Sequence, residues 1–123
     1  SITSAMVKNP YLIMGLSTSA RSGLHGLSKA LSREVAQYNI TINNVLPERI
    51  DTDRQTQILN FQAKLADSTY EEAKKELEES LTAKRMGTVE EFSGICTFLC
   101  SEQAAYISGQ NISVDGGNST NLI

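Results

Sequence analysis

Hydrophobic residues recur at three- and four-residue steps between residues 14 and 38, and this spacing predicts a helix over the segment. The residues of this stripe are Leu16, Ala20, Leu24, Leu27, Leu31 and Val35. Gly15, Gly23 and Gly26 each cost about 1 kcal/mol relative to alanine inside a helix. We therefore expect these glycines to pack closely against another backbone, and we expect Asn39 to end the helix.

Two short segments have the composition of strands. Residues 40–46 (ITINNVL) are β-branched or apolar at most positions, which is typical of a strand covered on both faces, and Pro47 ends it. Residues 111–115 alternate between polar and apolar, which predicts a second strand closed by a glycine pair. Residues 1–4 have the composition of the end of a third strand.

Residues 51–82 are polar and charged, and the part that reads DSTYEEAKKELEESL predicts a solvated amphipathic helix. The apolar stripe of this helix consists of Tyr70, Ala73, Leu77 and Leu81. Ser68 or Asp67 is the expected N-cap, because a short polar side chain at this position accepts a hydrogen bond from the first helical turn.

A further helix is predicted to begin after Thr88, because Thr88 and Glu91 have the spacing of a capping box. Cys96 and Cys100 lie one turn apart on this helix, and we expect two small buried residues there. Bridging this pair would strain the helix. The only histidine, His25, is far away in sequence, so no metal site is expected.

Strands and helices thus alternate along the chain, and this order predicts an α/β fold with a parallel sheet. Two or three strands cannot complete a doubly wound sheet. We therefore expect half of such a domain.

The chain has 123 residues and a formal net charge of −3, with 40% hydrophobic and 20% charged residues, as is ordinary for a soluble globular domain. Eleven Lys and Arg against 14 Asp and Glu do not make a basic surface, so no nucleic-acid partner is expected. No segment approaches the roughly 20 apolar residues of a membrane span. The first residues also lack a signal-peptide pattern, so we expect no membrane partner and a cytoplasmic location.

Four stretches, in this order and spacing, resemble the C-terminal half of short-chain dehydrogenases/reductases. They are the helix over 16–35, ITINNVLPERIDT (40–52), RMGTVEE (85–91) and ISGQNISVDGG (107–117). The resemblance implies the C-terminal half of a Rossmann-type doubly wound parallel sheet, with residues 1–123 as a partial NAD(P)-binding domain and 51–82 as the variable substrate loop. It also implies NAD or NADP as cofactor, a small-molecule carbonyl or alcohol as substrate, and a homodimer or homotetramer.

The resemblance also implies a catalytic set. In the family a serine polarises the substrate carbonyl, and a tyrosine 13 residues later exchanges the proton. A lysine four residues further on holds the nicotinamide ribose and lowers the pKa of the phenol. The matching residues here are Ser4, Ser17 and Arg21. A serine hydroxyl is a weaker acid than a phenol of pKa about 10, and arginine does not exchange a proton near neutral pH. The sequence leaves open whether Ser17 is catalytic, contacts a ligand or is only a polar residue at a helix start.

Two tyrosines offer alternative proton donors. Tyr70 and Lys74 have the family's spacing, but they lie in the charged helix far from Ser4, and Tyr70 belongs to its apolar stripe. We expect this pair to be structural. Tyr11 is the one aromatic hydroxyl near Ser4 and Ser17 in sequence, and it is a candidate substitute donor.

The cofactor-binding residues that the resemblance implies are Arg21, Pro47, Ile50 and Thr52. In the family, the matching isoleucine and threonine contact the nicotinamide carboxamide, and a glycine that lets the backbone approach the ring stands where this chain has Glu48. The family's glycine-rich phosphate loop has no counterpart in the sequence. We therefore expect the chain to be part of a longer protein and inactive by itself.

These features predict an oxidoreductase that transfers hydride between NAD(P) and a carbonyl or alcohol, as the activity of the full-length parent. The alternative is a catalytically inactive family member that acts as a binding or scaffolding subunit, which a broken phosphate loop upstream would favour. A helical interaction domain is a third hypothesis, and the buried strand over residues 40–46 argues against it.

Overall fold

Two short parallel strands form the centre of the computed structural model, which describes residues 1–122. Strand β1 (Asn44–Pro47) pairs with β2 (Asn111–Val114) along its whole length. The first residues of the chain run beside β1, where Ile2 forms an isolated parallel bridge with Val45. The parallel pairing and the helices around it confirm the predicted α/β fold.

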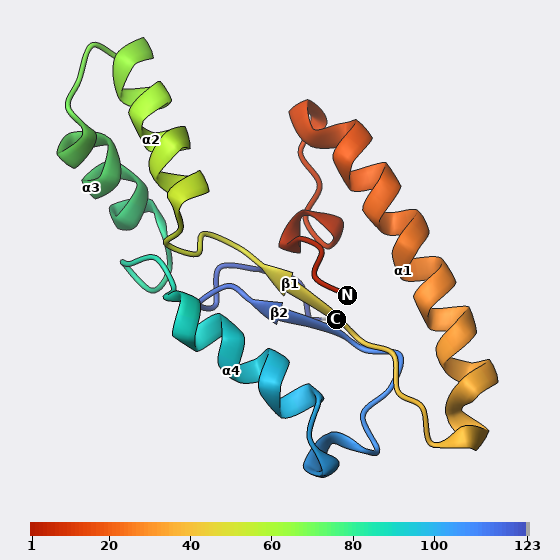
Figure 1. Cartoon of the computed structure of the whole chain (residues 1–123). Helices are drawn as coiled ribbons and strands as arrows, with labels where there is room; N and C mark the ends of the chain where they lie inside the picture. Colours follow the sequence, from red (N-terminus) through yellow and green to blue (C-terminus); the bar gives the residue numbers. More distant parts are fainter. Residues whose placement is uncertain (123) are drawn as a thin grey trace.

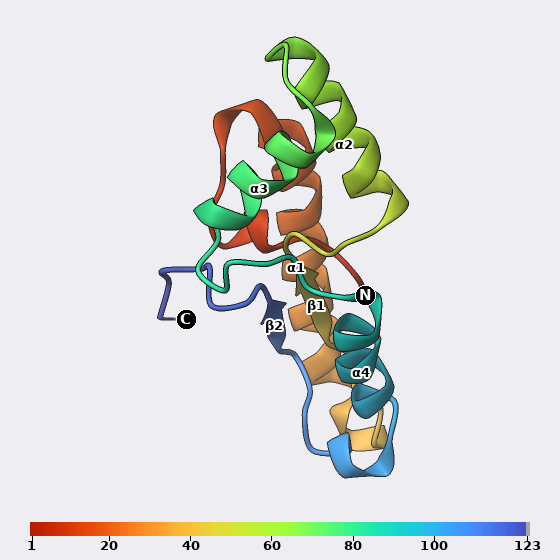
Figure 2. The ribbon, with the colours of Figure 1, turned by 90° about the vertical axis from the view of Figure 1, so that its left-hand side faces the viewer.

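Helices cover both faces of these strands. Helix α1 (Gly15–Val35) and helix α4 (Val89–Leu99) lie on opposite sides of β1 and β2 (Figures 1 and 2). Helices α2 (Asp53–Leu65) and α3 (Tyr70–Ser80) form a hairpin beyond the carboxyl end of β1 (Figure 1). Because β1 is covered from both sides, neighbouring residues of the strand are buried although their side chains point to opposite faces.

Helix α1 follows the predicted segment closely. Short 3-10 turns, Leu12–Met14 and Ala36–Tyr38, extend it at both ends, and Asn39 ends it in the left-handed region with φ 59°, as predicted. Within this chain the glycines have no close neighbour, since a Cβ atom at Gly15, Gly23 or Gly26 would meet no described atom within 4 Å.

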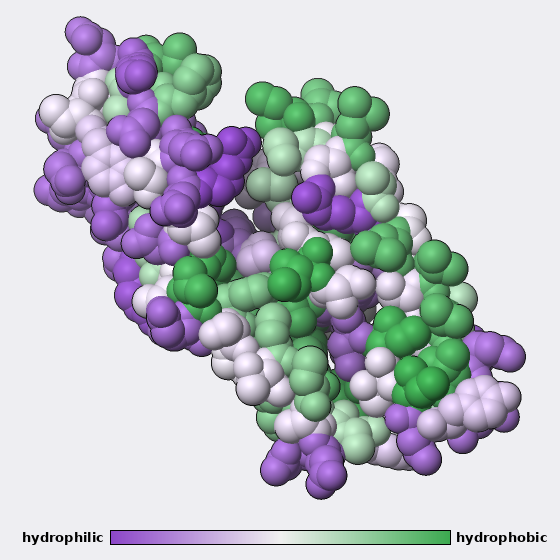
Figure 3. Space-filling model, viewed as in Figure 1, coloured by the Kyte–Doolittle hydropathy of each residue, from purple (hydrophilic) through white to green (hydrophobic). Residues whose placement is uncertain are grey.

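The hydrophobic stripe of α1 faces away from the strands. Leu16 is 93% exposed and Leu27 is 64% exposed. The buried residues of the helix are instead polar, and they are Thr18, His25, Ser28 and Ser32. Figure 3 shows hydrophobic side chains gathered along the outer side of α1. The stripe therefore indicates a second contact surface and not the side that packs on the sheet.

The predicted strand over 40–46 begins too early. The residues before Asn44 have other partners: the Ile42 carbonyl accepts from the Gly109 N–H at 2.7 Å, and the Ile42 N–H donates to the Ser108 hydroxyl at 3.2 Å. A turn and a side chain thus take the place of a neighbouring strand, and β-branched composition alone does not form a ladder.

The polar segment 51–82 folds as two helices, of which the sequence predicted one. Thr69, and not Ser68 or Asp67, is the N-cap of α3, because its hydroxyl accepts from the Glu72 N–H while the Glu72 carboxylate accepts from the Thr69 N–H. The predicted stripe does pack inward, on a buried cluster of Leu59, Leu81 and Met86.

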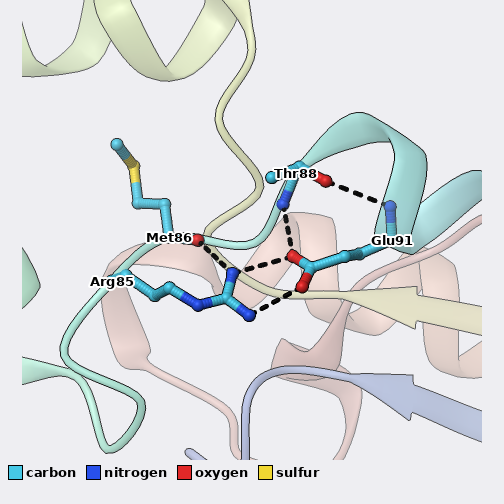
Figure 4. Close-up of polar contacts among 4 residues, drawn as sticks. All are labelled: Arg85, Met86, Thr88 and Glu91. Atoms are coloured by element: carbon cyan, nitrogen blue, oxygen red, sulfur yellow. Dashed lines mark hydrogen bonds and ion pairs between the residues drawn. The ribbon is translucent and has the colours of Figure 1, made fainter.

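The predicted capping box of α4 is confirmed, and a guanidinium joins it (Figure 4). The Thr88 hydroxyl accepts from the Glu91 N–H at 3.1 Å, and the Glu91 carboxylate accepts from the Thr88 N–H at 2.8 Å. Arg85 adds two hydrogen bonds to the same carboxylate, at 2.8 and 2.6 Å. Arg85 and the Thr88 N–H hold the pKa of Glu91 at about 2, below its ordinary 4.5. Cys96 and Cys100 are free, but the expected burial is wrong, since Cys100 is exposed.

We expect Glu91→Gln in the whole protein to lower the free energy of unfolding at pH 7, because the ionised carboxylate is the acceptor of the cap and of Arg85. A lowered carboxyl pKa stabilises the fold above pH 4.5, and this contribution is lost as the pH falls towards 2. The deficit of the variant should therefore shrink between pH 5 and pH 3, as followed by urea denaturation. Glu90→Gln, a change in the same helical turn, is the control and should match the wild type; an equal deficit at both pH values would contradict the prediction.

Candidate functional site

A cleft of about 360 Å³ lies at the carboxyl end of β1. Its walls come from the N-terminal segment, α1, the loop after β1 and the first turn of α4. The lining residues are Thr3, Ser4, Arg21, Pro47, Arg49, Ile50, Thr52, Val89 and Phe92. Five of the six predicted site residues thus share one cavity, and Ser17 is the one that does not line it.

Ser4 is fixed at the cleft by the residues around it. Its hydroxyl accepts from the Met6 N–H at 3.3 Å and caps a short 3-10 turn. The preceding Thr3 N–H donates to the Val45 carbonyl at 2.9 Å, and the Thr3 hydroxyl is 2.8 Å from Nε2 of His25. The segment that carries Ser4 is therefore tied both to β1 and to α1.

Ser17 reaches the cleft through Arg21, one helical turn later on α1. The Arg21 guanidinium donates to the Ser17 hydroxyl and, at 3.2 Å, to the Ser17 carbonyl. The hydroxyl oxygen accepts from a cation, so its own proton remains available to a further acceptor. These hydrogen bonds hold the Arg21 guanidinium in place at the cleft, although Ser17 itself does not line it.

The loop after β1 is held against the segment that precedes α4. Ile50 forms a parallel bridge with Gly87, whose N–H donates to the Arg49 carbonyl at 3.0 Å. A Cβ atom at Gly87 would lie 2.9 Å from Cδ1 of Ile50, so a larger residue here would displace the end of that side chain at the cleft. Thr52 then caps α2 by accepting from the Gln55 N–H at 3.4 Å. Both ends of the loop are therefore anchored, and Ile50 and Thr52 are presented to the cleft.

The sequence reasoning missed Arg49, which lies inside the motif PERIDT but was given no role. Its φ of 52° is in the left-handed region, where non-glycine residues are uncommon. Glu48, in contrast, does not line the cleft, since its carboxylate accepts from the Asn118 amide at 2.8 Å. The carboxylate that stands where the family has a glycine is thus directed away from the cleft.

The two alternative tyrosines lie outside the cleft wall. Tyr70 packs on the Leu59 cluster, which confirms the structural role predicted for it. Tyr11 precedes the first turn of α1 and is half exposed. Neither phenol is therefore placed to replace the tyrosine that the family resemblance predicts.

Residues 1–122 contain neither a candidate metal-binding cluster nor a helix that could span a membrane. No group of three or more His, Cys, Asp or Glu side chains that could hold a metal ion occurs within them. Over the same residues, no helix combines the length and the apolar character that a membrane span needs.

His25 is the one titratable side chain among the buried residues that the structure describes. The residue is 7% exposed, and its ring contacts the hydroxyl of Thr3, which also lines the cleft. Burial of the ring, and then the positive charge of Lys8, lower the pKa of His25 below its ordinary 6.5. The lowered pKa favours the neutral imidazole at pH 7, and the Thr3 hydroxyl can donate to or accept from its Nε2.

The profile of the family described as enoyl-(acyl carrier protein) reductase matches residues 1–119. The NADPH-dependent reductase BacG of Bacillus subtilis is 34% identical over 118 residues, which are 96% of this chain and 46% of the relative. The crystal structure of YwfH, an NADPH-dependent reductase involved in bacilysin biosynthesis, superposes with a TM-score of 0.89 at 33% identity and covers 98% of this chain and 46% of that one.

A more distant structure gives the same result. L-sorbose reductase of Gluconobacter frateurii, solved with NADPH and L-sorbose, has a TM-score of 0.90 at 27% identity over 98% of this chain and 46% of its own. The chain thus spans about half the length of the relatives it matches. These likenesses confirm the predicted Rossmann-type fold and the predicted resemblance.

Because of His25, we expect the free energy of unfolding of the whole protein to decrease as the pH is lowered below 6.5. A lowered histidine pKa means that the unfolded chain takes up the proton first, so the stabilisation is complete above pH 6.5 and is lost as the pH falls below it. His25→Gln keeps a hydrogen-bonding side chain but does not titrate. The difference in unfolding free energy between wild type and variant should be constant above pH 7 and should shrink by pH 5.5; a constant difference across this range would contradict the prediction.

Proposed function

Because the chain belongs to the short-chain dehydrogenase/reductase family, we propose that the whole protein is an NAD(P)-dependent oxidoreductase that interconverts a small-molecule carbonyl and its alcohol. The observation that carries the proposal is the single cleft shared by Ser4, Arg21 and the loop from Pro47 to Thr52.

The residues of the cleft suit the nicotinamide end of the cofactor. Pro47 and Ile50 provide an apolar wall for a flat ring, Thr52 provides a hydroxyl beside it, and Arg21 provides a cation for a ribose or a developing negative charge. When bound, NADPH supplies the hydride for the carbonyl carbon. The cofactor named for the relatives above is NADPH, and we use it as the probe.

Each side chain then has a defined task. Ser4 lines the cleft, and its hydroxyl donates a hydrogen bond to the carbonyl oxygen. Arg21 stabilises the negative charge that develops on this oxygen, and Ser17 positions Arg21 through the hydrogen bonds to its hydroxyl and carbonyl. Because arginine does not release a proton near neutral pH, the oxygen takes its proton from water.

One feature favours the alternative of a catalytically inactive binding or scaffolding subunit. Ser17 and Arg21 stand where the family's tyrosine and lysine are expected, so the usual proton donor is missing. Such a subunit would turn over no carbonyl, whether or not it binds the nicotinamide cofactor.

We expect the wild-type whole protein to oxidise NADPH in the presence of methyl benzoylformate, and Ser4→Ala to lower kcat/KM about 10²- to 10³-fold, the effect of removing one donor to a developing oxyanion. Ser19→Ala, an exposed serine of α1, is the control and should be unaffected. Tight NADPH binding without any turnover by the wild type would favour the inactive subunit instead.

The outer face of α1 supports a proposal about assembly. It carries exposed Leu16, Leu24, Leu27 and Leu31, continuous with Leu12 and Ile13 before the helix. An apolar stripe of this kind on a helix is covered when it packs against a matching helix. We place a second copy of the protein on this face, as the homodimer or homotetramer that the family resemblance implies.

Leu27→Glu should therefore shift the whole protein to smaller species in sedimentation velocity, because it buries a charge in the interface. Phe61→Glu is the matched control, since Phe61 lies on α2 and is 63% exposed against 64% for Leu27. An unchanged sedimentation coefficient for Leu27→Glu, with a circular dichroism spectrum like that of the wild type, would refute the interface.

A further inference from the structure

The cleft has an unbalanced positive charge in a chain whose net charge is negative. Two of the residues that line it are arginines, Arg21 and Arg49, and none of them is an aspartate or a glutamate. Arg21 is engaged by Ser17. Arg49 takes part in neither of the ion pairs recorded among residues 1–122, which are Lys75–Glu79 and Arg85–Glu91. The cleft therefore attracts an anionic ligand.

Arg49 also lines a neighbouring cavity of about 220 Å³ that does contain carboxylates. Each of these carboxylates already has its own hydrogen-bond partners. The partners are the Asn118 amide for Glu48, the Arg85 guanidinium for Glu91, and the N–H groups of Gly117 and Ser119 for Asp115. Only Glu91 among them is paired with a cation, and no ion pair recorded among residues 1–122 joins Arg49 to Glu48 or Asp115.

The backbone at Arg49 is held in an unfavourable conformation. Left-handed φ values are disfavoured for residues other than glycine, and the Gly87 N–H fixes this one by donating to the Arg49 carbonyl. Glycine or asparagine would adopt the same conformation more easily. Strain at a cationic residue that borders a cleft is typical of a side chain retained for a ligand.

We propose that Arg49 determines substrate specificity by binding a carboxylate of the substrate, next to the carbonyl that Ser4 polarises. This inference rests on the proposed reductase function. A guanidinium offers paired N–H donors that match the two oxygens of a carboxylate. Ser4 and Arg49 line the same cleft, so one small 2-oxo acid can meet both groups.

The test compares two ketones that differ by one charge, benzoylformate and its methyl ester, with NADPH and the whole protein. The informative variant is Arg49→Asn, because asparagine tolerates the left-handed backbone while removing the cation. Lys84→Asn is the matched control: Lys84 is also a cation in the left-handed region, with φ 57°, and it lines neither cavity.

We expect the wild type to prefer the acid, and Arg49→Asn to lower kcat/KM for benzoylformate about 10- to 100-fold, the loss of one charge-assisted hydrogen bond. The value for the methyl ester should change little, and the melting temperature should not fall. Lys84→Asn should behave as the wild type with both ketones.

Three outcomes would overturn the inference. The first is an equal loss of kcat/KM for the acid and the ester, and the second is a wild type without preference for the acid. The third is a raised KM for NADPH with the acid preference kept, which would assign Arg49 to a cofactor phosphate. Calorimetric titration with benzoylformate separates the inference from the reductase proposal. Benzoylformate binding that depends on Arg49, without any NADPH oxidation, would support the anion site and refute the reductase proposal. NADPH oxidation that is unchanged in Arg49→Asn would support the reductase proposal and refute the anion site.

Discussion

The parallel pairing of β1 with β2 is the constraint on which the rest of the structure depends. Two parallel strands end at the same edge of their sheet, so the loop after β1 and the turn after β2 emerge side by side. The contacts that define the cleft begin at this edge. Ile50 is bridged to Gly87 there, and Glu48 is hydrogen-bonded to Asn118.

The cleft is assembled from segments that are far apart in sequence, and hydrogen bonds hold them in place. Thr3 links the first residues of the chain to β1 through its backbone and to His25 through its hydroxyl. Arg21 brings α1 to the same cavity. The site thus depends on polar contacts between elements, which are directional and fix the position of Ser4 more closely than apolar packing would.

The sequence predicts features that depend on neighbouring residues, but not features that depend on contacts between distant segments of the chain. The capping box of Thr88 and Glu91 needs only residues three apart, and the structure has it. The N-cap of α3 was misassigned because three polar residues follow one another, and the geometry of the preceding turn selects Thr69. Arg49 could not be identified, because its left-handed backbone and its place at the cleft arise from pairing with Gly87. The family resemblance found most of the cleft residues, since their spacing is preserved.

Helix α1 turns a polar side to the sheet and an apolar side outward. Docking a polar face releases little water from hydrocarbon surface, so the helix gains little free energy from the contact within its own chain. The larger apolar area of α1 is desolvated only by another surface. If that surface belongs to a second copy, as proposed above, the folding equilibrium is coupled to association, and the apparent stability rises with protein concentration by mass action.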